Sequence, residues 1–154
     1  MPVKIGDIVD ALEMQFDESG TYLDKETGEV ITISFQVIGM AEEGESPDAL
    51  PDWRQPEFKT AQLMHETPDR YLELPSKFDV NEWQIMEEFA SSVEDEALRD
   101  ELLSAIHGRG AFRYFKDVIH RRGVKEDWYK FRSEALREIA VEWLEENGLT
   151  YSEA

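Results

Sequence analysis

The spacing of hydrophobic residues changes partway along this chain of 154 residues, and this change constrains the fold more than any other feature. Residues 21–24 and 29–35 are rich in β-branched and aromatic side chains in alternating order, as in half-buried strands. Between them, Gly28 can supply the positive φ that a four-residue hairpin turn needs. From about residue 79 onward, apolar residues recur every three or four positions, which is the period of an amphipathic helix. The chain is therefore predicted to combine a small antiparallel sheet with helices.

The same periodicities predict the remaining elements. Residues 5–14 carry apolar side chains at helical spacing and are predicted to form a short helix. Residues 71–74 suit an edge strand, because Pro75 ends it and has no N–H for a sheet ladder. Four C-terminal helices are predicted: one capped by Asp79 or Asn81, one over residues 94–106, one ending at Arg122 and one over residues 125–146. The fold class is α+β, with the short helix, hairpin and edge strand packed against about four C-terminal helices.

Residues 39–60 are predicted to be an acidic loop or insertion. From Gly39 to Pro56 the chain contains two glycines and three prolines among five acidic residues, a composition that sustains neither a helix nor a central strand. A calcium-binding loop is the alternative, but the alternating Asp and Asn ligands of an EF-hand are absent.

Composition limits the class of protein. A length of 154 residues with 41% hydrophobic residues is sufficient for one core, so a single domain over residues 1–154 is predicted. The net charge of −19 repels nucleic acids and anionic membranes, which argues against both as partners. No apolar stretch resembles a signal peptide or a membrane span, and the absence of cysteine fits a reducing compartment. A cytoplasmic protein is expected.

The basic residues are concentrated in one segment. Residues 107–137 contain nine of the 16 Lys and Arg residues but only four of the 35 Asp and Glu residues, so their net charge is +5 against −24 for the rest. On a helical wheel beginning at residue 109, the cations form a stripe about 60° wide and the apolar residues occupy a separate arc. The stripe consists of Arg109, Arg113, Lys116 and His120. Phe112 and Phe115 lie on the apolar arc and are expected to face a core.

Three hypotheses account for this stripe. It could neutralise the acidic helix of residues 94–101 and have no other role. It could be an anion site, in which the glycine turn lets the backbone approach a ligand and the arginines donate bidentate hydrogen bonds. It could be a helix-turn-helix that presents residues 111–122 to DNA, which the net charge disfavours. The candidate anion-binding or partner-binding residues are His107, Gly108, Arg109, Gly110, Arg113, Lys116 and His120.

The sequence offers no support for catalysis, a metal or a cofactor. The three histidines are His65, His107 and His120, and none belongs to a metal-binding motif. His107 could act as a general base, but at the end of a helix it more often binds terminal carbonyls. Neither a Walker loop nor a Rossmann glycine motif is present. No catalytic residue, metal site or cofactor is therefore predicted, although an enzyme acting on a phosphorylated small molecule stays an alternative.

The last predicted helix has a stripe of large apolar residues. They recur every three or four positions: Trp128, Phe131, Ala135, Ile139, Trp143 and Leu144. Packing within the chain is the ordinary interpretation of such a stripe. A homodimer interface is the alternative, because aromatic residues are enriched at such contacts.

Several segments, in this order and spacing, resemble an uncharacterised bacterial family of small acidic proteins. The similar segments are residues 10–13, 22–24 and 27–30, Pro75, Phe78, residues 86–89, the segment Ala105-Ile106-His107-Gly108-Arg109-Gly110-Ala111-Phe112-Arg113-Tyr114-Phe115-Lys116-Asp117, and residues 128–132 and 139–144. The resemblance covers most of the chain apart from about residues 39–64, and it implies no activity, cofactor or catalytic residue.

The leading functional hypothesis is a non-enzymatic interaction module. Its basic helix and glycine turn would bind an acidic or phosphorylated partner. The alternative is that the acidic remainder of the chain binds basic proteins or imitates the charge of a nucleic acid.

Overall fold

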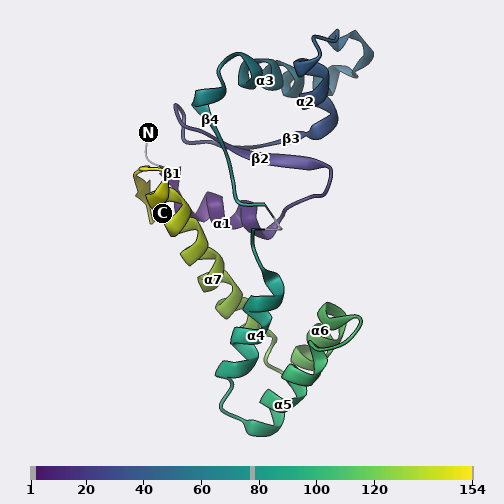
Figure 1. Cartoon of the computed structure of the whole chain (residues 1–154), viewed down its shortest axis with the longest axis vertical. Helices are drawn as coiled ribbons and strands as arrows, with labels where there is room; N and C mark the ends of the chain where they lie inside the picture. The colour runs from purple at the N-terminus through teal and green to yellow at the C-terminus, as the bar shows by residue number, and fades with distance from the viewer. Residues whose placement is uncertain (1–2, 77–78, 154) are drawn as a thin grey trace. The chain divides into compact units, whose positions relative to one another are not determined.

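A computed structural model describes residues 3–76 and 79–153, and it confirms the α+β class (Figure 1). In chain order the regular elements are β1 (Val3–Lys4), α1 (Ile5–Glu13), β2 (Ser19–Asp24), β3 (Val30–Ser34), α2 (Phe35–Glu42), α3 (Gln55–Glu66), β4 (Tyr71–Glu73), α4 (Glu82–Ser92), α5 (Glu96–Ala105), α6 (Ala111–Arg121), α7 (Lys125–Glu146) and β5 (Tyr151–Ser152). Three short 3₁₀ turns are η1 (Pro47–Ala49), η2 (Asp52–Arg54) and η3 (Pro68–Arg70).

Internal contacts divide the chain into two compact units. Unit 1 comprises Met1–Lys77 and Ala140–Ala154, and unit 2 comprises Phe78–Ile139. Unit 1 has six basic and 21 acidic residues, a net charge of −15, whereas unit 2 has ten and 14, a net charge of −4. The single domain over residues 1–154 stays a prediction, and each unit is described by itself.

The three-stranded sheet of unit 1 has the predicted hairpin and the predicted edge strand. The strand order is β3-β2-β4, and both neighbours run antiparallel to β2. In the register, Leu23 of β2 lies between Val30 of β3 and Leu72 of β4. Gly28 adopts a φ of 78°, as the turn requires. Strand β4 lies at the edge, where the proline at residue 75 is tolerated.

An ion pair fastens the edge of this sheet. Asp24, the last residue of β2, is only 6% exposed. Its two carboxylate oxygens accept hydrogen bonds from Nε and NH2 of Arg70, both at 2.8 Å, and its Oδ1 also accepts from the N–H of Glu26 at 3.0 Å. The Arg70 hydrogen bonds hold the pKa of the Asp24 carboxyl below its usual value, although burial acts in the opposite direction. Because Arg70 directly precedes β4, the pair ties β4 to the hairpin.

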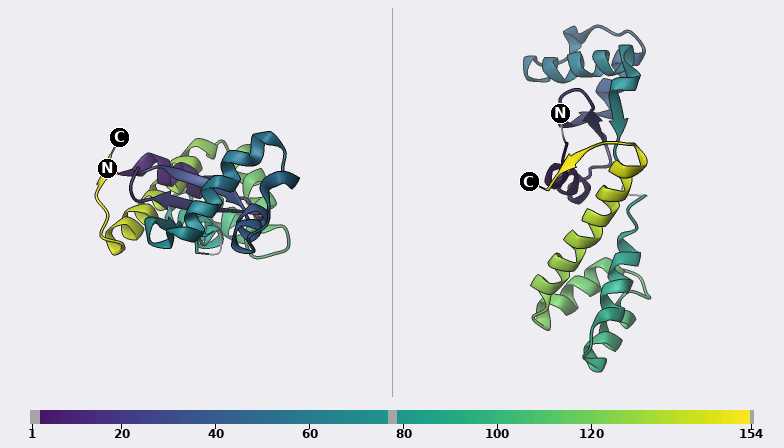
Figure 2. Two further views of the ribbon diagram at one scale, coloured as in Figure 1. Left: turned by 90° about the horizontal axis from the view of Figure 1, so that it is seen from above. Right: turned by 90° about the vertical axis from the view of Figure 1, so that its left-hand side faces the viewer.

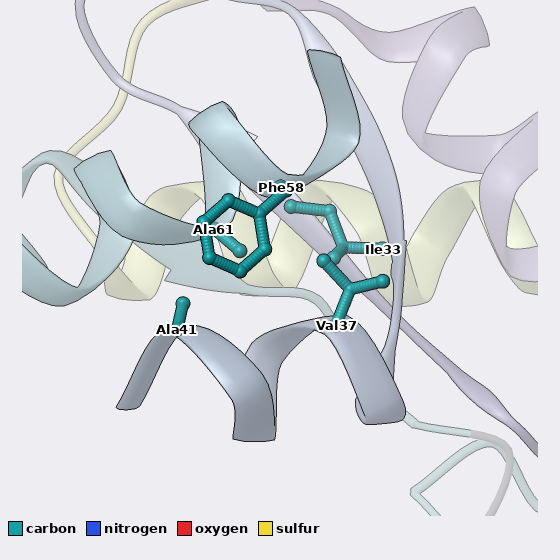
Figure 3. Close-up of a cluster of buried hydrophobic side chains, with 5 residues drawn as sticks. All are labelled: Ile33, Val37, Ala41, Phe58 and Ala61. Carbon is teal, nitrogen blue, oxygen red and sulfur yellow. The ribbon is translucent and has the colours of Figure 1, made fainter. Parts of the chain in front are cut away.

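The predicted loop of residues 39–60 is wrong at both ends. Helix α2 continues to Glu42 and helix α3 begins at Gln55, so only residues 43–54 connect the two helices, and this connection includes the turns η1 and η2. The composition was misleading because tertiary burial stabilises both helices. Their buried side chains form one cluster with the sheet: Ile33, Val37, Ala41, Phe58 and Ala61 (Figure 3). Pro56 lies in the first turn of α3, where its missing N–H leaves no helical hydrogen bond unmade.

Helices cover both faces of the sheet in unit 1. Helices α2 and α3 lie side by side on one face and α1 lies on the other, as Figure 2 shows in two views. Helix α1 confirms the predicted short helix and buries Ile5, Ile8 and Leu12. Strands β1 and β5 form a parallel pair in which Val3 lies opposite Tyr151. The sequence does not predict this pair, because two-residue strands have no periodicity.

Unit 2 contains the four predicted C-terminal helices, of which α7 continues into unit 1. Asn81 rather than Asp79 caps α4, since its side chain accepts a hydrogen bond from the N–H of Gln84 at 3.0 Å. The core of the unit is aromatic. Phe89 packs edge-to-face against Phe115, Trp128 and Phe131, with ring centroids 5.4–6.2 Å apart. Over the residues that the structure describes, no helix is both long and apolar enough to cross a bilayer.

Candidate binding surface on helix α6

A glycine turn sets the start of α6. Ile106 ends α5, and Gly110 precedes α6 in the left-handed conformation with a φ of 71°. Side chains other than glycine rarely adopt this backbone, so Gly110 is required where it stands. The left-handed residue also excludes Arg109 from the helix. The predicted stripe of four residues is therefore wrong in one position: Arg109 lies in the turn, and only Arg113, Lys116 and His120 share a helical face.

The opposite side of α6 faces the core of unit 2. Phe115, Val118 and Ile119 are buried, and the ring of Phe115 lies 4.8 Å from that of Trp128. Phe112 differs from the prediction, because half of it is exposed. It lies in the first turn, at the margin of the apolar arc, where the core no longer covers the helix. Tyr114 is 55% exposed, so the first turn of α6 presents two aromatic rings to solvent.

The cations of α6 fall into two groups. Along the stripe, the imidazole of His120 is exposed in the last turn of α6, and the cations nearer the start are exposed as well: Arg109, Arg113 and Lys116. None of these four side chains has an ion pair within residues 3–76 and 79–153. Those at the end are paired. Arg121 donates a hydrogen bond to Glu101 of α5, and NH1 of Arg122 lies 3.3 Å from the other oxygen of Glu101. NH2 of Arg122 also lies 4.0 Å from Asp95.

The two groups show which basic residues of α6 neutralise the acidic helix α5. The acidic helix α5 is neutralised in part by α6, as one hypothesis predicted, but through Arg121 and Arg122. The exposed stripe does not contribute to these pairs. Asp117 is the one acidic residue of α6, and it is exposed. Three cationic side chains in the glycine turn and the first half of α6 therefore stay exposed without an ion pair among the described residues, as does the imidazole of His120.

His107 packs within unit 2 against a residue of α4. Its ring packs edge-to-face against Trp83 of α4, with centroids 6.0 Å apart. The indole N–H of Trp83 donates to the backbone oxygen of Ile106 at 2.9 Å. These contacts fasten the glycine turn to α4 and set the position from which Arg109 projects. His107 itself is exposed, so it borders the candidate surface.

Exposed aromatic side chains accompany the cations. Besides Phe112 and Tyr114, the first turns of α7 expose Tyr129, over whose ring the Lys125 amine lies at 5.8 Å from the centroid. The helical wheel could have identified Tyr114, which lies about 140° from the start of the stripe and away from the apolar arc. The wheel also separates exposed Phe112, at the margin of the apolar arc, from buried Phe115 in its middle. Among the described residues, no group of three or more His, Asp or Glu side chains could hold a metal ion.

Comparison with known proteins identifies a family without an assigned activity. The family described as an uncharacterised protein family, UPF0158, matches residues 1–153, and the chain belongs to it. A UPF0158 protein of Pseudomonas aeruginosa is 29% identical over 144 residues, which cover 92% of this chain and 82% of the relative. No solved structure matches the chain. The predicted resemblance to an uncharacterised bacterial family is thus confirmed.

Proposed function

We propose that this member of the UPF0158 family is a non-enzymatic interaction module whose α6 surface binds an acidic or phosphorylated partner. The α6 surface consists of Arg109, Arg113, Lys116 and His120 with the exposed rings of Phe112 and Tyr114. One observation carries the proposal: Arg109, Arg113 and Lys116 lack ion pairs among the described residues, although acidic residues outnumber Lys and Arg by 35 to 16. In such an acidic chain, cations that stay exposed and clustered are available for an external anion.

The position of Arg113 supports a role outside the fold. It lies in the first turn of α6, where the partial positive charge of the helix terminus disfavours a cation. The helix therefore gains no electrostatic stabilisation at its terminus from this residue. A carboxylate or phosphate of a partner would interact favourably both with the helix terminus and with the Arg109 and Arg113 guanidinium groups, which donate bidentate hydrogen bonds.

The exposed aromatic rings indicate the kind of complex. Solvent-exposed ion pairs contribute about 0.2–1 kcal/mol each, so Arg109, Arg113 and Lys116 alone give weak, salt-sensitive binding. Phe112 and Tyr114 would add apolar contact that salt does not screen. An acidic segment with an apolar residue beside its anions suits this surface better than a free ion does. Steering by the cations would speed association at low ionic strength.

A charge-matched pair of variants tests the proposal. Replacing Arg109 and Arg113 with Gln removes two charges from the exposed group, and replacing Arg121 and Arg122 with Gln removes two charges from the paired group. We expect the first variant to bind an oligoglutamate or phosphoserine-containing peptide at least tenfold more weakly than the unmodified protein. We expect the second to change binding less than threefold. Fluorescence anisotropy at low and high salt measures both affinities.

The outcomes separate the site from general charge effects. Equal losses in both variants would show that only net charge matters, and unchanged binding in the first variant, if folded by circular dichroism, would contradict the proposal. A single-stranded oligonucleotide serves as a third probe. Tighter binding of the oligonucleotide than of either peptide would make nucleic acid the partner class and overturn the proposal.

A further inference from the structure

Unit 1 contains an open cleft far in sequence from α6. Its volume is about 680 Å³, which lies within the range of small-ligand and side-chain pockets. The walls are the exposed side of α2 and the irregular segment that follows it. The residues that matter for its chemistry are Phe35, Gly39, Met40, Glu43, Glu45 and Leu50.

Helix α2 has two apolar sides, and only one of them faces the core. Val37 and Ala41, four residues apart, enter the cluster shown in Figure 3. Phe35, Gly39 and Glu43 are also spaced by four, so they form a second row along the helix. Phe35 is 49% exposed in this row. The second side of α2 is therefore the wall of the cleft.

Gly39 lies in this wall, and neither its backbone conformation nor its packing requires a glycine. It is in the interior of α2, where glycine is less favourable than alanine. Its φ is not positive, unlike that of Gly44, which has a φ of 72° just after the helix. A Cβ placed on Gly39 would meet nothing within 4 Å. The folded chain has room for a side chain at residue 39. Because glycine has none, the cleft stays open above this residue.

The charge of the cleft selects the ligand. Its lining residues include Glu43 and Glu45, and no Lys, Arg or His lines it among the residues that the structure describes. They belong to a unit whose net charge is −15. Anionic ligands are therefore repelled. A ligand with a cation beside an apolar group can pair with the carboxylates and pack against the apolar wall at the same time.

We infer that this cleft is a second docking surface, which takes a segment of a partner protein in which a bulky apolar side chain lies next to Lys or Arg. The apolar side chain lies over Gly39 between Phe35 and Leu50. The neighbouring cations pair with Glu43 and Glu45 at the rim. This inference is independent of the α6 surface, which has the opposite charge.

Three synthetic peptides test the chemistry of the cleft. The probe is Lys-Lys-Phe-Lys-Lys, and its controls are Lys-Lys-Ala-Lys-Lys and Glu-Glu-Phe-Glu-Glu. In titrations followed by amide NMR, we expect saturable shifts at Gly39, Met40 and Leu50 with the first peptide only. Equal responses to the phenylalanine and alanine peptides, or shifts spread over all acidic surfaces, would show general charge attraction and overturn the inference.

Substitutions at the floor and rim of the cleft complete the test. We expect Gly39→Leu to weaken the first peptide at least tenfold while the melting temperature stays equal or rises. Glu43→Gln with Glu45→Gln should weaken it at least fivefold, whereas Glu42→Gln with Asp48→Asn, which removes two equal charges outside the cleft, should have less than a twofold effect. Unchanged binding in folded Gly39→Leu would overturn the inference. Concentration-dependent shifts of the same amides without peptide would assign the cleft to a second copy of this chain and also overturn it.

Discussion

Arg70 in unit 1 and Arg113 in unit 2 are the same residue type in opposite situations. Arg70 meets the buried carboxylate of Asp24 through two hydrogen bonds of 2.8 Å, and it fastens an edge strand. Arg113 is exposed at the start of α6 and has no ion pair among the described residues. The comparison shows that a cation has a structural role where burial and geometry supply its counterion. A cation with neither is expected to contribute little to stability, and measurements of unfolding should separate the two kinds.

Asp24→Asn should have the largest effect on stability. The substitution keeps the shape of the side chain but removes the charge that Arg70 binds. Because hydrogen bonds to charged groups contribute about 1.5–3 kcal/mol, we expect the free energy of unfolding to fall by about 2 kcal/mol. Urea denaturation followed by circular dichroism measures this loss.

Glu26→Gln is the matched control for this substitution. Glu26 also pairs with Arg70, at 3.3 Å, but its side chain is 68% exposed. Exposed pairs contribute little, so the expected loss is less than about 0.5 kcal/mol. A loss as large as that of Asp24→Asn would show that burial does not distinguish structural from available charges in this chain.

The contribution of Asp24 should also depend on pH. Its pKa is lower in the folded chain than the value of about 3.9 expected when unfolded, so the unfolded state takes up a proton first on acidification. The stabilisation is therefore complete above about pH 5 and is lost as the pH falls through the folded pKa. We expect the difference in unfolding free energy between the unmodified protein and Asp24→Asn to be constant at neutral pH and to narrow below about pH 4. A difference that grows with acidification would contradict the assigned direction.

Strong periodicity made part of this architecture predictable. The hairpin, the edge strand and the four C-terminal helices follow from alternation, helical spacing and the glycine at residue 28. Helices α2 and α3 did not, because Phe58 and Ala61 stabilise them through contacts with Ile33 and α2 that no local rule contains. Tertiary burial there outweighs the local preferences of proline and glycine.

The candidate surface was predictable in its charge but not in its geometry. The concentration of cations in residues 107–137 predicted the segment in which Arg109, Arg113 and Lys116 are exposed. A helical wheel cannot show that Gly110 is left-handed, and so it placed Arg109 on the helix. Nor can it show which cations reach a counterion. Arg121 and Arg122 pair with Glu101 because α5 and α6 pack together in three dimensions.

The smallest effects should distinguish the two groups of cations on α6. Arg121→Gln with Arg122→Gln removes the pairs to Glu101 and also removes cations from the end of the helix, where its partial negative charge favours them. We expect a loss of about 0.5–1 kcal/mol in the free energy of unfolding.

Arg113→Gln with Lys116→Gln removes two cations that repel each other at a spacing of three residues, and Arg113 lies where the helix terminus disfavours it. For this double variant, the free energy of unfolding is expected to change by less than about 0.3 kcal/mol. Thermal and urea unfolding of both variants measure the contrast, which high salt should reduce by screening the exposed pairs. A lower stability of the Arg113 and Lys116 variant than of the Arg121 and Arg122 variant would contradict this prediction. It would show that Arg113 and Lys116 stabilise the fold, so that binding a partner is not needed to explain their presence.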